Sequence, residues 1–280
     1  MTHHHDQGPI LILGGTGKTG RRVAEKLTAR EIPVRIGSRS ASPAFDWTDN
    51  ASWAGALDGV SAVYITYHPD LAIPGAAETV GAFAHQAVAS GVKRLVLLSG
   101  RGEPEAQRSE QLIAQSGADW TVVRSSWFAQ NFSETFMSDG IGVGQVVLPA
   151  GNVREPFIDA EDIADVVVAA LTEDGHIGQI YEVTGPRLLT FAEAIGEIAK
   201  ATGRKIDYIP VTVDDYVAEL RKQEVPEDLV LLLDELFRNV LDGRNEYLAD
   251  GVHRALGRQP RDFSDYAKRT AASGIWGGNQ

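Results

Sequence analysis

A short glycine-rich segment near the start of the chain constrains the fold more than any other feature. Four apolar residues, Ile10 to Leu13, are followed by glycines at positions 14, 17 and 20, and residues 21–30 then carry apolar side chains at helical spacing. An apolar run that stops at glycine is typical of a buried strand in a parallel sheet. The segment therefore predicts a strand, a tight turn and a helix, in that order.

This order of elements predicts a site for a phosphorylated ligand. Glycine lets the backbone approach a pyrophosphate closely, and the first turn of a helix offers unpaired N–H groups and a partial positive charge. The spacing Gly-x-x-Gly-x-x-Gly differs from the Gly-x-Gly-x-x-Gly of ordinary dehydrogenases, and a Walker A motif is excluded because position 12 is isoleucine. We expect a bound dinucleotide; an ordinary glycine-rich turn is the alternative.

The residues after the second predicted strand, 33–37, indicate which dinucleotide is bound. An acidic residue there accepts a hydrogen bond from the 2′-hydroxyl of NAD, whereas an arginine accommodates the 2′-phosphate of NADP. The chain has no Asp or Glu between Val34 and Ala44, and Arg39 follows the second strand. Arg39 would form a charge-assisted pair with a 2′-phosphate, and Ser38 would add a hydroxyl. The sequence therefore favours NADP(H), with a solvated surface arginine as the alternative.

Strands and helices alternate from residue 10 to residue 123. Further strands are expected at 44–47, 62–66, 93–98 and 120–123, and helices at 50–57, 74–90 and 103–116. This alternation predicts an α/β fold with a doubly wound parallel sheet, the Rossmann fold, in which ligands lie beyond the carboxyl ends of the strands. We expect the following residues to surround the cofactor: Gly14, Thr16, Gly17, Lys18, Thr19, Gly20, Ser38, Arg39, Asp46, Trp47, Thr66, Tyr67, Ser99 and Arg124.

The pattern changes after residue 124. Residues 125–137 are rich in aromatic side chains, strands are expected at 145–148 and 180–184, and helices follow Asp159, Thr190 and Pro226. An apolar stripe between Leu229 and Leu241 predicts a buried helix, or else a lid or dimer face. We expect a disordered tail, an NADP-binding Rossmann domain with further sheet elements at about 155–185, and a smaller, mainly helical substrate lobe, at residues 1–8, 9–150 and 186–280.

Composition excludes several classes of function. The net charge of −12 argues against nucleic acid as a main partner, because phosphate contacts need a basic face. The chain has no cysteine and its histidines lack ligand spacing, so we expect no metal. No apolar run reaches the length of a membrane span, and the first residues do not resemble a signal peptide. We expect a cytoplasmic protein with a small-molecule substrate and neither a nucleic-acid nor a membrane partner; a homodimer is allowed.

Several longer motifs point to one protein family. Besides the glycine turn, they lie at residues 45–47, 92–99, 127–134, 156–164 and 257–263. Together they resemble atypical short-chain dehydrogenases/reductases of the NmrA-like group, above all the branch of the ergot-alkaloid (festuclavine and agroclavine) dehydrogenases and their bacterial relatives. The resemblance implies NADP(H) binding and, in the alkaloid branch, reduction of a carbon–nitrogen double bond. The chain departs from the pattern at Ser125, where the common sequence after the sixth strand is Arg-Pro.

The chain lacks the acid that ordinary short-chain dehydrogenases use. In their Tyr-x-x-x-Lys pair the lysine lowers the pKa of the tyrosine, which protonates a developing alkoxide. None of the seven tyrosines has a lysine four residues later. An iminium acceptor needs no such acid, because hydride transfer gives a neutral amine directly. We therefore expect an NADPH-dependent oxidoreductase that transfers hydride to an imine, iminium or quinone-like acceptor without a Tyr–Lys relay. A non-catalytic protein that senses NADP(H) is the alternative.

A few side chains are candidates for contact with the substrate. Ser99 stands where the standard family keeps its catalytic serine, and Tyr67 is a second catalytic candidate; a structural turn serine is the alternative for Ser99. Three aromatic residues, Trp127, Phe128 and Phe132, are candidates for the wall of a substrate pocket, since aromatic faces attract a cation. Core packing explains these three equally well.

Overall fold

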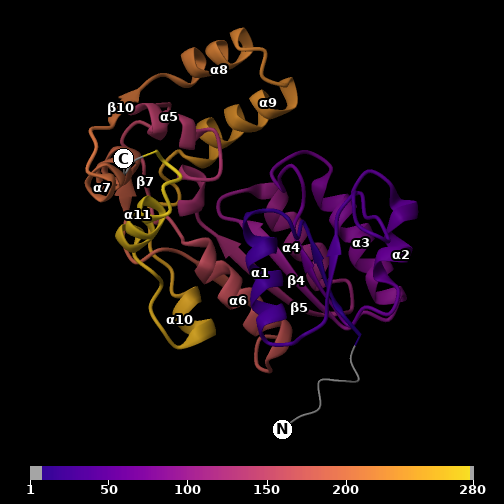
Figure 1. Cartoon of the computed structure of the whole chain (residues 1–280). Coiled ribbons are helices and arrows are strands. Elements are labelled where there is room, and N and C mark those ends of the chain that lie inside the picture. The colour runs from indigo at the N-terminus through magenta and orange to yellow at the C-terminus, as the bar shows by residue number, and fades with distance from the viewer. Residues whose placement is uncertain (1–7, 278–280) are drawn as a thin grey trace. The chain divides into compact units, whose positions relative to one another are not determined.

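The computed structural model describes residues 8–277, which form two compact units (Figure 1). The first unit extends to Ser125 and also includes Ala160–Val183 and Asp250–Arg258. The second comprises Ser126–Asp159, Thr184–Ala249 and the segment from Gln259 onward. The predicted ranges were 9–150, with further sheet elements at about 155–185, and 186–280; these units instead place residues 126–150 in the second unit and Asp250–Arg258 in the first. The predicted tail, 1–8, lies almost entirely outside the described residues.

A six-stranded parallel sheet forms the centre of the first unit, in the order β2-β1-β3-β4-β5-β8. Its buried central strands are rich in valine, leucine and isoleucine, as a sheet covered on both faces requires. The predicted doubly wound fold is confirmed. The strands are β1 (Ile10–Leu13), β2 (Val34–Gly37), β3 (Ala62–Ile65), β4 (Arg94–Gly100), β5 (Asp119–Ser125) and β8 (Gln179–Val183).

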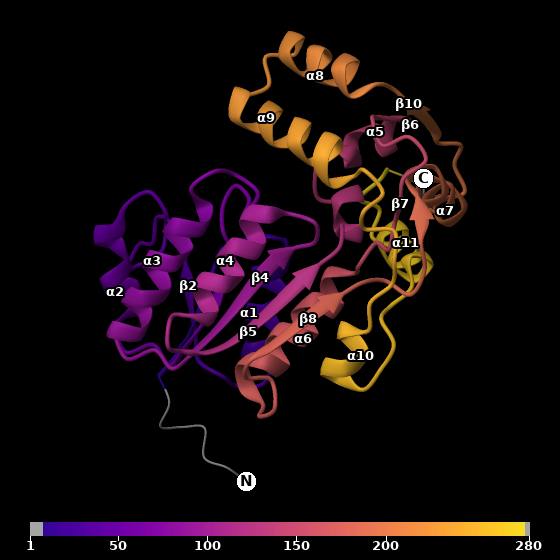
Figure 2. The same ribbon diagram turned by 180° about the vertical axis from the view of Figure 1, so that it is seen from behind.

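Helices cover both faces of this sheet. Helices α1 and α6 pack together on one face, and α3 and α4 pack together on the other (Figures 1 and 2). The helices of this unit are α1 (Lys18–Ala29), α2 (Trp53–Leu57, after a 3₁₀ turn at Asn50–Ser52), α3 (Ala76–Ala89), α4 (Pro104–Ala114), α6 (Ala160–Thr172) and α10 (Gly251–Leu256). The carboxyl ends of the strands lead into the glycine turn, the loop after β2 and the first turn of α4.

The prediction of a strand at 44–47 was wrong. The backbone contacts of this segment are an isolated bridge between Asp46 and Asp49 and a hydrogen bond from the Phe45 N–H to the Ser38 carbonyl at 2.9 Å, which do not make a strand. Side chains take the hydrogen bonds that a sheet would otherwise make: the Trp53 indole donates to the Asp46 carbonyl at 2.8 Å, and the Trp47 indole donates to the Thr66 carbonyl at 3.1 Å. The segment is therefore a loop that its aromatic side chains hold in place.

The second unit is mainly helical and contains two small sheets. In one, β6 (Gln145–Leu148) pairs in parallel with β10 (Asp207–Pro210); in the other, β7 (Arg154–Glu155) pairs antiparallel with β9 (Leu189–Thr190). The predicted helix after Thr190 is α7 (Phe191–Thr202), and a capping box of Thr190 and Glu193 begins it. The helices are α5 (Met137–Val143), α7 (Phe191–Thr202), α8 (Val213–Lys222), α9 (Glu227–Glu235) and α11 (Phe263–Ala272), with a 3₁₀ turn at Ala129–Phe132 and a π-helical turn at Leu236–Val240.

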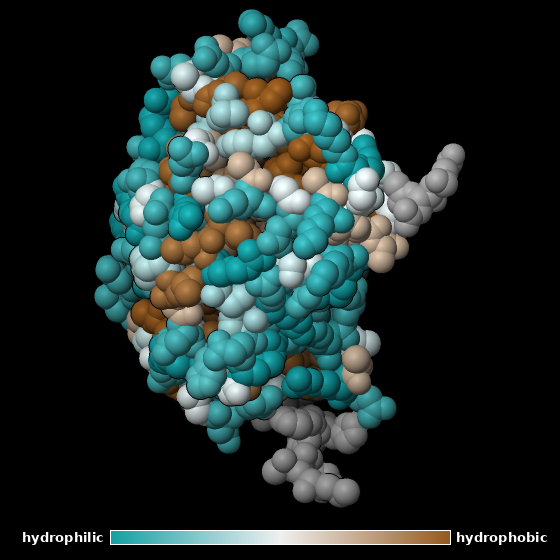
Figure 3. Space-filling model, turned by 90° about the vertical axis from the view of Figure 1, so that its left-hand side faces the viewer, coloured by the Kyte–Doolittle hydropathy of each residue, from teal (hydrophilic) through white to brown (hydrophobic). Residues whose placement is uncertain are grey.

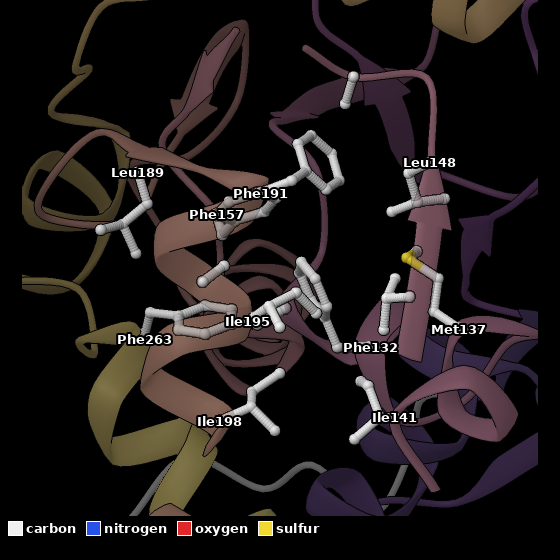
Figure 4. Packing of buried hydrophobic residues seen from close by; sticks show 14 of the residues in the cluster. Phe132, Met137, Ile141, Leu148, Phe157, Leu189, Phe191, Ile195, Ile198 and Phe263 are labelled. Atoms are coloured by element: carbon white, nitrogen blue, oxygen red, sulfur yellow. The ribbon is translucent and has the colours of Figure 1, made fainter. Parts of the chain in front are cut away.

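Aromatic rings from distant parts of the sequence form the core of the second unit (Figure 4). The ring centroid of Phe132 lies 5.3 Å from that of Phe157 and 5.4 Å from that of Phe263, both in edge-on geometry. Phe157 makes a similar contact with Phe191 at 5.1 Å. Edge-to-face pairs stabilise a core beyond the area that they bury. This cluster joins the start of α7 and the start of α11 to the segment that precedes α5.

Apolar side chains at the surface of the second unit are dispersed. Figure 3 shows brown patches separated by hydrophilic residues on one face of the molecule. Within the stripe between Leu229 and Leu241, Leu233, Phe237, Val240 and Leu241 are buried, whereas Leu229 is 41% exposed. The stripe is thus a partly buried helix. No helix within residues 8–277 is long and apolar enough to cross a membrane.

Candidate functional site

The glycine turn after β1 has the geometry of an anion site. Gly14 has a left-handed backbone with φ of 62°, and its carbonyl accepts a hydrogen bond from the Gly17 N–H at 2.8 Å. A Cβ on Gly20 would lie 2.2 Å from the Gly14 carbonyl oxygen, so glycine alone fits there. Gly17 is the N-cap of α1 and provides no side-chain cap, and the first turn of α1 has no acidic residue. Backbone N–H groups at a helix start with no negative side chain favour a phosphate.

Not every predicted side chain of the turn faces outward. Thr16 is exposed and Lys18 is half-buried, whereas Thr19 is only 4% exposed. The Thr19 hydroxyl accepts a hydrogen bond from the buried Tyr64 hydroxyl at 3.0 Å, and burial raises the pKa of Tyr64. Thr19 therefore anchors α1 to β3 through its side chain, and it offers a ligand only its backbone N–H.

Residues after β3 brace the turn. The Thr66 hydroxyl donates to the Leu13 carbonyl at 2.9 Å, and a Cβ on Gly14 would lie 2.4 Å from that hydroxyl. The Trp47 indole donates to the Thr66 carbonyl, and the Trp47 ring lies 5.0 Å from the ring of Tyr67. The structure thus brings together Gly14, Thr66, Trp47 and Tyr67.

Arg39 is exposed in the loop after β2, where a ribose phosphate is expected. Within residues 8–277 its guanidinium has no hydrogen-bonded partner. It lies near the Asp46 carboxylate, whose pKa is lowered mainly by hydrogen bonds from the backbone and hydroxyl of Thr48 and to a smaller extent by Arg39. Ser38 is half-buried and its hydroxyl lies 3.3 Å from that of Ser40. A guanidinium without a bound partner remains available to a dianionic phosphate.

Ser99 and Arg124 meet through a residue that the sequence did not single out. They are paired in the register of β4 and β5, and both bind the Glu110 carboxylate of α4. The Ser99 hydroxyl donates to Glu110 Oε1 at 2.6 Å, and Arg124 Nε donates to the same atom at 2.9 Å. This bond raises the pKa of Arg124. Ser99 is 2% exposed, so its hydroxyl is committed to Glu110 in this structure.

The charged network continues to the edge strand β8. Arg124 Nη1 lies 3.4 Å from Glu182 Oε2, and Arg101 Nε lies 2.8 Å from Glu182 Oε1. Arg101 and Glu110 are buried, whereas charged side chains are almost never fully buried unless they are paired. Sequence reasoning missed Arg101, Glu110 and Glu182, because charged residues in a turn, on a helix or on an edge strand look solvent-exposed until the strands are paired.

The aromatic pocket candidates belong to the second unit. Phe132 has no exposed surface and packs in the core described above, which is the position that core packing predicts. Trp127 is partly buried against the rings of Phe191 and Phe237, at 5.6 and 5.7 Å. Phe128 is half-buried and forms a backbone bridge to Ile158. In the part of the chain that the structure describes, no group of three His, Asp or Glu residues is placed to hold a metal ion.

Comparison with known proteins gives four informative matches: one protein family, two relatives and one solved structure. Residues 14–174 match the NAD(P)H-binding protein family. The agroclavine dehydrogenase of Claviceps fusiformis is 32% identical over 280 residues, which cover 92% of this chain and 95% of that protein. The NAD(P)H azoreductase of Xenophilus azovorans is 29% identical over 288 residues, 94% of this chain and 98% of that protein. The solved NADPH-dependent quinone oxidoreductase QOR2 of Escherichia coli, complexed with NADPH, superposes with a TM-score of 0.77 at 21% identity, over 93% of this chain and 99% of that one.

Proposed function

Because the chain belongs to the NAD(P)H-binding family of NmrA-like atypical short-chain dehydrogenases/reductases, we propose that it is an NADPH-dependent reductase of an imine, iminium or quinone-like acceptor. The family match agrees with the resemblance of its motifs. The proteins named above are a dehydrogenase, an azoreductase and a quinone oxidoreductase, and these names support the proposal that this chain is an oxidoreductase. The acceptor and the choice of NADPH over NADH are the parts that we propose.

The residues of the first unit fit a phosphorylated dinucleotide. The uncapped first turn of α1 would bind the pyrophosphate through backbone N–H groups, and Gly20 leaves the space that this approach needs. Arg39 and Ser38 would hold the 2′-phosphate, while Asp46 lies near Arg39. The bound cofactor would supply a hydride; the protein orients it and excludes water. The observation that carries the proposal is the unpartnered Arg39 guanidinium at the strand end next to the glycine turn.

Calorimetry with NADPH and NADH tests the cofactor choice. In Arg39→Ala we expect the Kd for NADPH to rise about tenfold to a hundredfold, because a charge-assisted hydrogen bond contributes about 1.5–3 kcal/mol. The Kd for NADH should change little. Arg30→Ala is the matched control, since Arg30 caps the opposite end of α1. An equal loss of affinity for NADPH and NADH, or an unchanged affinity for NADPH, would contradict this role of Arg39.

Turnover separates a reductase from a cofactor sensor. We expect oxidation of NADPH with at least one member of a panel of cyclic imines, preformed iminium ions, quinones and azo compounds. Tight NADPH binding without oxidation by any member would reject the reductase and favour a protein that senses NADP(H).

A further inference from the structure

Glu103 lies directly over the end of β4. It precedes α4 and is its N-cap residue, but its side chain makes no capping hydrogen bond. A Cβ built on Gly100 would lie 2.2 Å from Glu103 Oε1 and 2.3 Å from Oε2, so the carboxyl group fills the space where another residue would carry a side chain. Gly100 follows Ser99. The carboxyl group of Glu103 is therefore at the ligand-binding edge of the sheet, beside a residue that the sequence predicted to be catalytic.

The Glu103 carboxyl is left without a partner in an acidic environment. Within the described range, 8–277, no group hydrogen-bonds to it, although the residue is half-buried. The carboxylates that face it are Asp70, from the loop after β3, and Glu110 of α4. Their charges are balanced elsewhere: Lys18 faces Asp70, and Arg124 with Ser99 binds Glu110.

This environment favours the neutral acid. Burial is the main reason that the pKa of Glu103 lies well above its usual range, and the charges of Asp70 and Glu110 raise it further. A carboxylic acid that keeps its proton at higher pH can donate it to a reacting group. Two hydroxyl groups of the sheet are less suited, because Ser99 already donates to Glu110 and Tyr64 donates to Thr19 inside the unit.

We propose that Glu103 donates the proton that completes reduction, and that the acceptor is accordingly a neutral conjugated group such as a quinone or an azo compound. The inference rests on the proposed reductase function. Hydride addition forms a bond to one atom of the acceptor and breaks its π bond, which leaves an electron pair on oxygen or nitrogen. That pair takes the proton as the O–H bond of Glu103 breaks, and water then reprotonates the carboxylate. One reduced cofactor and one proton are consumed in each cycle.

The first test measures the protonation of Glu103 without any reaction. In cofactor-free protein labelled with ¹³C at glutamate carboxyl groups, one carboxyl resonance should titrate at a pH well above the others. It should disappear in Glu103→Gln, remain in Glu105→Gln, and move to lower pH in Asp70→Asn. Glu105 is the matched control because it lies two residues away in α4 and pairs with Arg108 instead. A high titration that persists in Glu103→Gln, or that never appears, would overturn the proposal.

The second test uses the reaction itself. Glu103→Gln should slow reduction of quinone or azo acceptors at least tenfold, at the low end of what a general acid contributes, and should abolish the solvent deuterium isotope effect. Its rate with a preformed iminium ion and its Kd for NADPH should match those of the wild type and of Glu105→Gln. If the wild type turns over and Glu103→Gln reduces quinones equally fast, this inference fails and the reductase stands. If the wild type fails to oxidise NADPH with every acceptor of the panel, both this inference and the proposed reductase function fail.

Discussion

Substitution of Gly20 by alanine tests the packing of the glycine turn. The new Cβ would lie 2.2 Å from the Gly14 carbonyl oxygen and 2.9 Å from the Gly15 Cα, whereas such atoms normally stay about 3.5 Å apart. The turn must therefore retreat by about 1 Å, which disturbs the 2.8 Å hydrogen bond from the Gly17 N–H to the Gly14 carbonyl. Overpacking of this kind costs about 1–3 kcal/mol, and the helical preference of alanine over glycine returns about 1 kcal/mol.

We expect Gly20→Ala to lower the free energy of unfolding by up to about 2 kcal/mol, measured by urea denaturation. The Kd for NADPH, measured by calorimetry, should rise at least about tenfold, because displaced N–H groups lose hydrogen bonds to a charged pyrophosphate. Gly196→Ala is the matched control: Gly196 lies inside α7, is exposed, and an added Cβ there would meet no atom within 4 Å. In this control the free energy of unfolding should rise by up to about 1 kcal/mol, and the Kd for NADPH should stay that of the wild type. A Gly20→Ala protein as stable and as tight-binding as the wild type would refute the steric argument.

Three further outcomes follow from buried contacts. Phe191→Ala empties the centre of the second core and should lower the free energy of unfolding by about 3–5 kcal/mol in urea denaturation; a loss below about 1 kcal/mol would show that the core collapses around the gap. Ser99→Ala removes a donor to Glu110 and should cost about 1–2 kcal/mol by the same measurement, whereas an unchanged midpoint would argue against a structural role. The hydrogen bond from Arg187 lowers the pKa of Asp262, so the stabilisation from Asp262 is complete above the ordinary pKa of 3.8 and is lost as the pH falls through its lower folded value. Thermal unfolding midpoints should therefore drop less on acidification in Asp262→Asn than in the wild type, and parallel curves would contradict this linkage.

Most elements of the first unit were predictable because their signals are local. Ile10–Leu13 is an uninterrupted apolar run, the glycines that follow are spaced for a turn, and the helix after them has one apolar face. Each signal depends on neighbours within a few residues, so no knowledge of tertiary contacts was needed. The register that brings Gly14 beside Thr66 then follows from parallel strands that end at one edge.

Long-range contacts account for what the sequence did not predict. The segment at 44–47 has the composition of a strand, but indole groups make hydrogen bonds in place of a neighbouring strand. Trp47 donates to Thr66, which is remote in the sequence, and Trp53 of the next helix donates to Asp46. Glu110 and Glu103 lie on and before an amphipathic helix, where acidic residues usually face water. Their burial depends on Arg124 and Gly100 of neighbouring strands, and only the paired sheet places these residues against them.

The edge strand β8 has a consequence for how this protein can be made and divided. It joins the sheet beside β5 although residues 126–159, which precede α6 and β8, fold into the other unit. While the ribosome is still translating that insertion, β5 has an unpaired edge of the kind that invites aggregation. No single cut in the chain yields a whole unit, so a stable fragment for expression or a chimaera with a relative must be assembled from several exchanged segments.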